Sequence, residues 1–527
     1  MASQSTLLPS ALYRADQVRE LDRIAIEDCG IEGFALMHKA ASVAFSALLE
    51  KWPHTKHLLI FVGTGNNGGD GYVLAGLAKD YGLNPELISL GDHAKLKGDA
   101  LRASEFAHQR HVPVNEFDRS TLLGTGSYPA DHTVIVDALL GTGLDRSVSN
   151  SYAEAISTIN DLAFPVLAVD IPSGLSSDTG TILGDVVRAD LTATFIGMKQ
   201  GLLTGAGVDV TGELVYSALD VPEQVFNGAD SPVPASNRIR LNQVARLLKP
   251  RLPSANKGHF GHTVIVGGDF GYGGAVLMAA SAALRAGSGL VSVVTRSANR
   301  AGFLARQPEI MLVGTEDPEQ SQGRVADLLA RASVIVIGPG LGKSAWSREM
   351  LDQVLQQQEV QGMPLVVDAD GLNLLAEKIS ASPASELAQE NWILTPHPGE
   401  AARLLDCESA EINADRFAAV RQLQTRWGGV VLLKGAGSLI CSGQRDKQVI
   451  ELCDAGNPGM ASGGMGDVLS GLIGGLVAQN FGLADSLRLA VCLHGEAADQ
   501  VARQTGERGL AATDLLPAIQ KLANPIL

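Results

Sequence analysis

The feature that most constrains the fold of this chain is a repeated alternation of short apolar runs with longer stretches of helical periodicity. Apolar runs of strand length occur in two series, at residues 57–63, 86–91, 133–141, 165–174 and 191–197, and then at 262–268, 289–295, 332–340, 364–371, 391–399 and 429–437. Parallel strands that are buried on both faces read as nearly continuous apolar runs. Each series therefore predicts a mostly parallel sheet covered by helices, and the chain as a whole predicts an α/β protein.

The boundaries of the two units follow from the remaining segments. Residues 12–28 and 34–49 carry apolar side chains at helical spacing, which predicts two amphipathic helices that pack on the first sheet. Between the two series, Pro, Ser, Asn and Gly accumulate without apolar periodicity, as is typical of a linker. We expect a first domain at 1–222, a linker at 223–237 and a second domain at 238–527. Two large domains suit 527 residues, because a domain usually takes roughly 100–200 residues.

Charge and cysteine usage exclude several classes of partner. Acidic residues outnumber basic residues by 57 to 41, and this net charge of −16 repels nucleic acid and anionic membrane surfaces. The five cysteines form no C-x-x-C pair, which argues against a disulfide framework or a zinc site. Neither a signal peptide nor a membrane-spanning apolar stretch stands out. We therefore expect a cytoplasmic protein with no nucleic-acid and no membrane partner.

The first chemical motif is GTGNNGGDG at residues 63–71, between an apolar run and a helical stretch. Its glycines satisfy the dinucleotide fingerprint G-x-G-x-x-G, and Glu86 follows where an acidic ribose partner is expected, so the motif alone suggests a dehydrogenase. Asn66, Asn67 and Asp70 favour another interpretation, because their oxygens suit a cation together with polar ligand groups. A glycine-rich turn that serves packing alone would not need these three side chains.

Two further strand ends carry matching groups. Asp137 closes one apolar run, and Asp170 closes the next, shortly before Ser173. A single aspartate at such a position is usually a turn or helix cap. In an open α/β sheet, however, ligands bind beyond the carboxyl ends of the strands, so these groups are expected to meet in one crevice with the 63–71 loop.

NNGGDG, VDALLGTGLDR and VDIPSGLSSDTG together resemble the NAD(P)H-hydrate epimerase family, over about residues 10–220. The resemblance implies a Rossmann-like three-layer α/β/α domain in which Asp170 contacts the hydrated nicotinamide nucleotide and Asn67, Asp137 and Ser173 coordinate K+. It also implies a set of residues that line the substrate: Asn66, Asn67, Gly68, Gly69, Asp70, Gly141, Thr142, Gly143, Leu144, Asp145, Arg146 and Ser147. Lys199 is either a proton-transfer partner of Asp170, a phosphate contact or a solvated loop lysine.

The second chemical motif is GNPGMASGGMGDVLSG at residues 456–471, a glycine run that leads into an apolar helical stretch. Gly463, Gly464 and Gly466 allow consecutive backbone N–H groups to point at one anion at a helix N-terminus. Asp467 would then accept a hydroxyl proton beside that anion. The motif resembles the G-x-G-D anion hole of ribokinase-fold small-molecule kinases.

Two other motifs of the second half are less specific alone. Lys434 follows an apolar run and precedes small residues, which suits a nucleotide phosphate, although a lysine after a core strand is usually just exposed. His397 stands between two prolines, and a lone histidine is more often a satisfied polar residue than a ligand.

These motifs, with NKGHFGHTVIVGG and GGAVLMAASAALRAGSGLVSV, resemble the NAD(P)H-hydrate dehydratase family over 240–527, which implies a ribokinase-like α/β domain. The resemblance implies substrate contacts at Ala275, Gly342, His397 and Asp467, with Gly340 as the alternative to Gly342. It places the AMP portion of the nucleotide on Lys434, Gly435, Ala436, Gly437, Ser438 and Gly466. It further implies ADP as the phosphate donor, with Mg2+.

Together the two halves resemble bifunctional NAD(P)H-hydrate repair enzymes, whose substrates are NADHX and NADPHX, with AMP as a product. In this hypothesis Asp467, Asp170 and Lys199 are catalytic, the second domain phosphorylates the hydrate so that the hydroxyl can leave, and the first domain interconverts the two epimers. We also expect a homo-oligomer. Two alternatives remain open: a ribokinase-like vitamin-precursor kinase fused to a dinucleotide-sensing domain, and a first half that acts only as a sensor.

Overall fold

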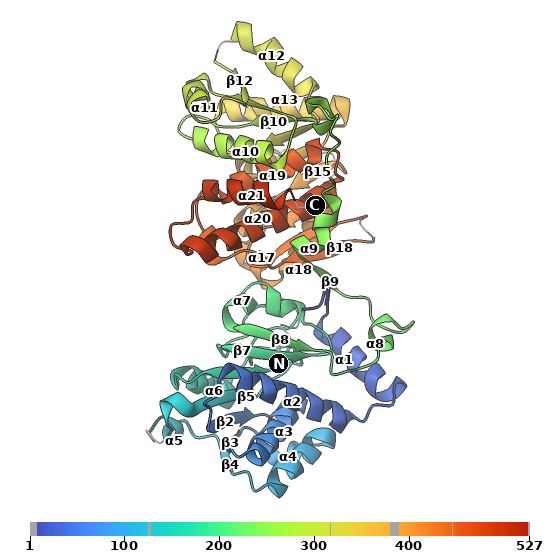
Figure 1. Ribbon diagram of the computed structural model, residues 1–527, viewed down its shortest axis with the longest axis vertical. Coiled ribbons are helices and arrows are strands. Elements are labelled where there is room, and N and C mark those ends of the chain that lie inside the picture. The colour runs from blue at the N-terminus through green and yellow to red at the C-terminus, as the bar shows by residue number, and fades with distance from the viewer. Residues whose placement is uncertain (1–7, 125–127, 317, 380–388, 445, 525–527) are drawn as a thin grey trace. The chain divides into compact units, whose positions relative to one another are not determined.

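The computed structural model describes residues 8–124, 128–316, 318–379, 389–444 and 446–524. It divides into two compact units, which we call unit 1 (Met1–Asn237) and unit 2 (Arg238–Leu527) and describe separately (Figure 1). The predicted linker, 223–237, contains the short helix α8 (Gln224–Asn227) and the start of β9 (Ser236–Ile239), which pairs with β1 (Ala11–Leu12). Within the described ranges, no helix has the length and apolar character needed to cross a bilayer.

Unit 1 is built on a seven-stranded parallel sheet in the order β4-β3-β2-β5-β6-β7-β8. The strands are β2 (His57–Val62), β3 (Asn84–Ser89), β4 (Val114–Glu116), β5 (Thr133–Ala138), β6 (Val166–Val169), β7 (Leu191–Phe195) and β8 (Glu213–Ser217). In β2, Leu58, Ile60 and Val62 belong to one apolar core, whereas Leu59 and Phe61 belong to a second core on the opposite face. The alternation of side chains along a strand therefore buries both faces of the sheet.

Helices cover both of these faces. The first core includes side chains from α1 (Ala15–Arg23), α2 (Gly33–Lys51), α3 (Asn66–Tyr81) and α4 (Gly98–Gln109). The second core includes side chains from α5 (Arg119–Gly124) and α6 (Asn150–Asp161). The short helix α7 (Gly207–Val210) precedes β8. The three-layer α/β/α arrangement predicted for the first half is confirmed, and the two predicted N-terminal helices correspond to α2 and to α1 with the π-helical turn Ile24–Asp28.

Unit 2 contains a mixed sheet with the order β18-β17-β16-β15-β14-β13-β10-β11-β12. Its strands are β10 (His262–Val266), β11 (Leu290–Thr295), β12 (Met311–Gly314), β13 (Val334–Ile337), β14 (Leu365–Val367), β15 (Trp392–Leu394), β16 (Val430–Leu433), β17 (Ser438–Ser442) and β18 (Val449–Cys453). The strands from β16 to β12 pair in parallel, and only β16–β17 and β17–β18 are antiparallel. The α/β class is thus confirmed for this half, although β12, β17 and β18 were not predicted.

The helices of unit 2 are α9 (Leu241–Val244), α10 (Gly273–Ala286), α11 (Arg300–Arg306), α12 (Pro318–Ala330), α13 (Ala345–Gln361), α14 (Ala369–Ile379), α16 (Pro398–Leu405), α17 (Ser409–Ala414), α18 (Arg416–Trp427), α19 (Met465–Ala478), α20 (Leu483–Thr505) and α21 (Leu515–Leu522). Helices α10 and α19 pack so closely that a Cβ on Gly471 would lie 1.9 Å from Ala279 O, and one on Gly475 would lie 2.7 Å from Ala283 O. Only glycine permits this approach, which explains part of the high glycine content.

The register of the strands places the chemical motifs at one edge of each sheet. In unit 1, Asp137 pairs with Phe61 on one side and Ala168 on the other. In unit 2, Ile337 of β13 pairs with Val266 of β10 and Val367 of β14. The loops that follow these strands therefore emerge side by side, as expected for the ligand edge of an open α/β sheet.

Candidate functional site

Unit 1 has a cleft of about 630 Å³ beyond the carboxyl ends of β2, β5 and β6. Most of the predicted substrate-lining residues line it, namely Asn66, Asn67, Asp70, Gly141, Thr142, Gly143, Leu144, Asp145, Arg146 and Asp170, together with Lys199. Gly68, Gly69 and Ser147 are not among the lining residues. A Cβ on Gly68 would lie 2.1 Å from Gly63 O, and one on Gly69 would lie 2.6 Å from the Met37 side chain, so these two glycines allow close packing of the first turn of α3.

Asp170 and Lys199 form an ion pair in this cleft. Asp170 follows β6 with a φ of 68°, which ends the strand earlier than the apolar run predicted and turns the carboxylate out of the sheet. The Lys199 ammonium group, whose side chain is 1% exposed, also donates to Thr194 Oγ1 (3.1 Å) and to Phe195 O (3.0 Å). The solvated-lysine alternative for Lys199 is therefore wrong.

Two more carboxylates face the same cleft. Asp22 of α1 and Asp70 of α3 both line it. Burial raises the pKa of Asp22 to about 6, with Lys199 opposing and Asp170 adding to the rise. Burial also raises the pKa of Asp70 well above its usual value, and Asp170 and Asp22 add to that rise. Asp22 was missed in the sequence, where its only signal is its place next to Leu21 in the apolar stripe of the first helix.

Asp137 and Ser173 lie below the cleft and are buried. Ser173 donates to Asp137 through its hydroxyl (2.6 Å) and its backbone N–H (2.7 Å), and Leu139 N donates a third bond (3.2 Å). Burial nevertheless raises the pKa of Asp137 to about 6. Asn67 Nδ2 donates to Leu140 O (3.1 Å), which leaves its buried Oδ1 without a hydrogen-bond partner among the described residues. The structure thus brings the three predicted K+ ligands together.

In unit 2, Lys434 and Asp368 form the centre of a second polar site. Lys434 Nζ donates to Asp368 Oδ1 (2.7 Å) and lies 3.8 Å from Glu400 Oε2. Asp368 also accepts from Thr395 Oγ1 (2.8 Å). Burial alone would lower the pKa of Lys434, but Asp368 and Glu400 outweigh it and raise that pKa. The Lys434 ammonium group therefore stays charged beyond the carboxyl ends of β14, β15 and β16. The alternative that Lys434 is merely an exposed lysine is wrong.

His397 occupies the N-cap of α16. Its Nδ1 accepts from Gly399 N (3.0 Å) and Glu400 N (3.4 Å), and its Nε2 lies 3.3 Å from Glu400 Oε1. Burial and the nearby cations Lys434 and Arg403 lower the pKa of His397. The imidazole is thus a neutral ring that stabilises a helix start and leaves one side partly exposed.

The glycine run 456–464 leads into α19 through Gly464, whose φ of 93° is in the left-handed region. The backbone N–H groups of Gly464, Met465 and Gly466 have no acceptor among the described residues. Asp467 follows them in the first turn, and burial raises its pKa to about 7, with Asp368 adding to the rise and Lys434 opposing it. The arrangement offers aimed donors for an anion and a carboxylate that titrates near neutral pH.

The predicted glycine contacts lie at the next strand ends. Gly342 N donates to Asp370 Oδ2 (2.9 Å) in the loop between β13 and α13. A Cβ on Gly340 would lie 3.0 Å from Ala275 Cβ at the start of α10, so the two loops touch. Gly340 therefore lies beside Ala275, whereas the nearest neighbours of Gly342 are Asp269 and Ser347.

The remaining predicted residues belong to the loop that follows Lys434. Gly435, Ala436 and Gly437 lie between β16 and β17, Ser438 is the first residue of β17, and Gly435 has a φ of 140°. The buried guanidinium group of Arg416 donates to Gly437 O (3.2 Å) and Lys434 O (3.4 Å). Arg416 was missed because nothing near it in the sequence points to this loop. Asp368 was also missed, but it could have been found, because it ends an apolar run as Asp137 and Asp170 do.

Comparison with known proteins gives matches to both halves. Residues 33–201 match the family described as YjeF-related protein N-terminus, and residues 263–521 match the family described as NAD(P)H-hydrate dehydratase. The chain is 44% identical over 516 residues to a bifunctional NAD(P)H-hydrate repair enzyme of Coxiella burnetii, covering 98% of this chain and 100% of that protein. It is 40% identical over 525 residues to the enzyme of the same name from Escherichia coli, covering 100% and 96%.

Among solved structures, an ADP/ATP-dependent NAD(P)H-hydrate dehydratase from Bacillus subtilis, co-crystallised with ATP/Mg2+, has a TM-score of 0.46 and 25% identity, covering 54% of this chain and 95% of that one. A ribokinase-like superfamily protein from Enterococcus faecalis has a TM-score of 0.48 and 29% identity, covering 54% and 94%.

Proposed function

The chain belongs to the family of bifunctional NAD(P)H-hydrate repair enzymes, and from this premise we propose which of its residues carry out the two reactions. The protein is a NAD(P)H-hydrate epimerase and an ADP-dependent NAD(P)H-hydrate dehydratase. Unit 1 carries the epimerase and unit 2 carries the dehydratase. Its substrates are the two epimers of NADHX and NADPHX, and ADP is converted to AMP.

The dehydratase reaction rests on one observation, the three unsatisfied backbone N–H groups at the start of α19 beside Asp467. Hydroxide is a poor leaving group, so the hydroxyl of the hydrate must first be phosphorylated. Asp467 accepts the hydroxyl proton while the oxygen attacks the terminal phosphorus of ADP, and AMP departs. The free N–H groups and Lys434 stabilise the charge on the transferred phosphoryl group. The nitrogen lone pair of the ring then expels phosphate to give an iminium ion, and loss of a proton from the neighbouring ring carbon restores the dihydronicotinamide.

The nucleotide is held by Lys434, the Gly435–Ser438 loop and Gly466, and the nicotinamide nucleotide by Ala275, Gly342, His397 and Asp467. Mg2+ fits this site through the phosphates of ADP rather than through an all-protein cage. Among the residues that the structure describes, no three His, Cys, Asp or Glu side chains form a metal-binding group. Mg2+ commonly uses one or two carboxylates plus substrate phosphates, and Asp370 would supply such a carboxylate. When bound, Mg2+ neutralises phosphate charge.

The epimerase reaction uses the carboxylates of the unit 1 cleft. The hydrate carries its hydroxyl on a carbon bonded to the ring nitrogen. Asp170, paired with Lys199, removes the hydroxyl proton as that carbon–nitrogen bond breaks, and Asp22 or Asp70, whose pKa values are raised by burial, gives a proton to the nitrogen. Rotation of the resulting aldehyde and reversal of the proton transfers close the ring on its other face. The remaining residues that line the cleft, Asn66, Asn67 and residues 141–146, hold the nucleotide.

K+ fits the buried group formed by Asn67, Asp137 and Ser173. The unpartnered Asn67 Oδ1 and the buried Asp137 carboxylate are oxygen donors without a balancing cation among the described residues. A monovalent cation would supply that charge and fix the loops that follow β2 and β5. We also expect assembly into a homo-oligomer, measurable by light scattering, and a cytoplasmic location, measurable by fractionation.

One incubation tests the proposal. The protein is mixed with both hydrate epimers, ADP and Mg2+, and the absorbance of the reduced nicotinamide is followed together with AMP and phosphate. We expect complete recovery of NADH or NADPH with stoichiometric AMP and phosphate. A stable phosphorylated product formed from ATP would instead support a vitamin-precursor kinase. Recovery of one epimer only would assign unit 1 a sensing role.

A further inference from the structure

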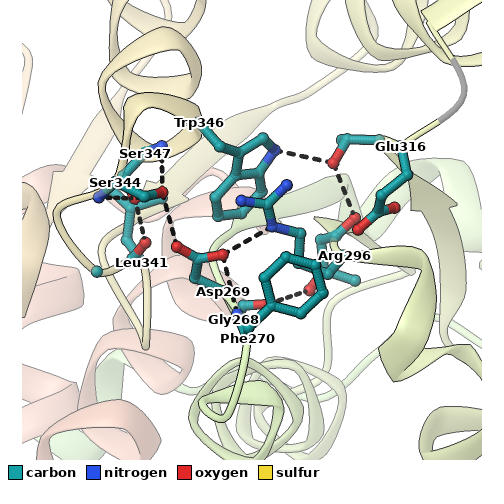
Figure 2. Close-up of polar contacts among 12 residues, drawn as sticks. Gly268, Asp269, Phe270, Arg296, Glu316, Leu341, Ser344, Trp346 and Ser347 are labelled. Atoms are coloured by element: carbon teal, nitrogen blue, oxygen red, sulfur yellow. Dashed lines mark hydrogen bonds and ion pairs between the residues drawn. The ribbon is translucent and has the colours of Figure 1, made fainter.

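A polar cluster in unit 2 lies outside the residues used above. It joins the loops that follow four neighbouring strands, with Asp269 after β10, Arg296 after β11, Glu316 after β12 and Ser344 after β13 (Figure 2). Thr315 precedes Glu316 in the loop after β12. All four loops emerge at the same carboxyl edge as Asp368 and His397. The cluster therefore extends the proposed active-site edge toward β12.

Arg296 is the centre of this cluster and is held from several sides. Its Nε donates to Asp269 Oδ1 (2.7 Å), and its guanidinium carbon lies 4.5 Å and 4.3 Å from the ring centres of Phe270 and Trp346. Its partners are fixed in turn, since Asp269 Oδ2 accepts from Ser344 Oγ (2.7 Å) and the indole N–H of Trp346 donates to Thr315 Oγ1 (2.8 Å). The guanidinium group is consequently preorganised, because little side-chain freedom remains to be lost on binding.

The open part of Arg296 is its terminal edge. Two aromatic rings cover the group and Asp269 accepts from its Nε, which is the only side-chain hydrogen bond that Arg296 makes within the described part of the chain. In Figure 2, accordingly, no dashed line joins its terminal amino groups to the other residues drawn. The side chain is 14% exposed, so solvent or a ligand reaches it. Two parallel N–H groups on a fixed plane suit the bidentate recognition of an oxyanion. A purely structural arginine would direct these donors at protein carbonyls.

The cluster lies far enough from Asp368 to contact a distant part of the proposed dinucleotide substrate. A Cβ on Gly342, a proposed substrate contact, would lie 3.3 Å from Asp269 Oδ2. Along the sheet, β11 is three strands from β14, which carries Asp368 at its end, and three strand spacings span about 14 Å. A dinucleotide whose nicotinamide lies at Asp467 must extend its pyrophosphate and adenosine along this edge, and Arg296 is a described cation on that route.

We propose that Arg296, clamped between Phe270 and Trp346 and pinned by Asp269, binds a phosphate group of the dinucleotide hydrate in unit 2. This inference rests on the proposed dehydratase function. The phosphate belongs either to the pyrophosphate that every dinucleotide carries or to the 2′-phosphate that only NADPHX carries. Asp269 is a positioning residue in this arrangement, because it acts through Arg296.

The test compares wild type with Arg296→Met in the full chain, with KM measured for NADHX, NADPHX and ADP. Loss of two charge-assisted hydrogen bonds should raise the KM for the hydrate about 10- to 100-fold while the KM for ADP stays the same. A rise for both hydrates identifies the pyrophosphate, and a rise for NADPHX alone identifies the 2′-phosphate. The wild-type KM should also increase with salt more steeply than that of the variant, since salt screens the charge.

Arg300→Met is the matched control, because this exposed arginine begins α11 only four residues further on. It should leave all KM values unchanged. If Arg296→Met does not fold, Arg296→Met/Asp269→Asn removes the unpaired carboxylate and keeps a polar partner for Ser344. Unchanged KM values for both hydrates in a folded Arg296 variant would overturn the inference. If wild type shows no ADP-dependent turnover, the proposed function fails. The inference about Arg296 is then tested separately, by measuring the affinity of wild type and variant for NADPH by fluorescence. Equal affinities would overturn it.

Discussion

The ammonium group of Lys434 lies 2.7 Å from Asp368 Oδ1, directly beside the first turn of α19. A Cβ on Gly466 would lie 3.5 Å from that ammonium and 3.7 Å from Asp368 Oδ2. The ion pair thus sets a fixed positive charge against the helix N-terminus that offers three free N–H groups. Any anion bound by those N–H groups also meets Lys434.

Replacing this lysine should separate a binding effect from a folding effect. Lys434→Met leaves the buried Asp368 carboxylate unpaired, which should lower the free energy of unfolding by about 3 kcal/mol and raise the KM for ADP at least about tenfold. Lys434→Met/Asp368→Asn should recover most of the stability, measured by chemical denaturation, but not the KM. A double variant with the wild-type KM for ADP would show that the cation does not bind phosphate.

Asp467→Asn should abolish ADP-dependent dehydration, because the amide cannot accept the hydroxyl proton. We expect kcat to fall about 10²- to 10⁴-fold, as for other general bases, while epimerisation in unit 1 is unaffected. The matched control is Asp327→Asn, an exposed carboxylate on α12. Dehydratase turnover of Asp467→Asn at the control rate would refute the assignment.

The same substitution should change how stability depends on pH. The pKa of Asp467 is raised to about 7 in the folded protein, above its ordinary value, so the folded state holds this proton more tightly than the unfolded state. The stabilisation that protonated Asp467 contributes to the folded state is therefore fully present below about pH 4 and is lost as the pH rises through about 7. The free energy of unfolding of Asp467→Asn should exceed that of wild type by roughly 4 kcal/mol at pH 8, with little difference at pH 4. An equal difference at both pH values would contradict the raised pKa.

Asp170→Ala should leave dehydration intact but stop the recovery of reduced nucleotide once the reactive epimer is exhausted. The reason is that Asp170 removes the hydroxyl proton in the proposed epimerisation. Chiral chromatography of the remaining hydrate measures the outcome, and we expect only the unreactive epimer to accumulate. Epimerisation at the wild-type rate would exclude Asp170 as the base.

Asn67→Ala should weaken the response of epimerisation to K+. The substitution removes the buried Oδ1 that has no hydrogen-bond partner in the described structure, so the K+ concentration for half-maximal activity should rise at least about tenfold. Asn66→Ala is the comparison, because Asn66 lines the cleft without belonging to the K+ group and should affect KM for the hydrate instead. Identical K+ dependence of wild type and Asn67→Ala would remove Asn67 from the ligand set.

The parts of each site that could be predicted from the sequence are those that the local chain holds together. The NNGGDG motif and the 456–471 glycine run each combine a strand or helix end with its polar residues over a few positions. NNGGDG was predicted as a loop before a helix, but it forms the first turns of α3, which begins at Asn66. The strand-terminal Asp137 and Asp170 were found for the same reason. Strand limits were less well predicted, since Asp170 leaves the sheet at a positive φ that an apolar run does not signal.

Other residues could be recognised only in three dimensions. Asp22 reaches the unit 1 cleft from the first helix, and Arg416 reaches the Lys434 loop from α18. Arg296 became a candidate ligand only when Phe270, Trp346 and Asp269, from three different loops, were seen around it.

The sequence by itself determined the α/β class, because apolar periodicity acts over short stretches of chain. It also predicted two domains, and it predicted a cation site near residues 63–71 and an anion site near residues 456–471 from local glycine and polar patterns. The tertiary structure alone decided which distant charges meet, such as Lys434 with Asp368 and Lys199 with Asp170. The physical reason is that strand order and register set the distances between these groups. The pKa values then follow from burial and from neighbouring charges, which depend on the whole fold and not on any single position in the sequence.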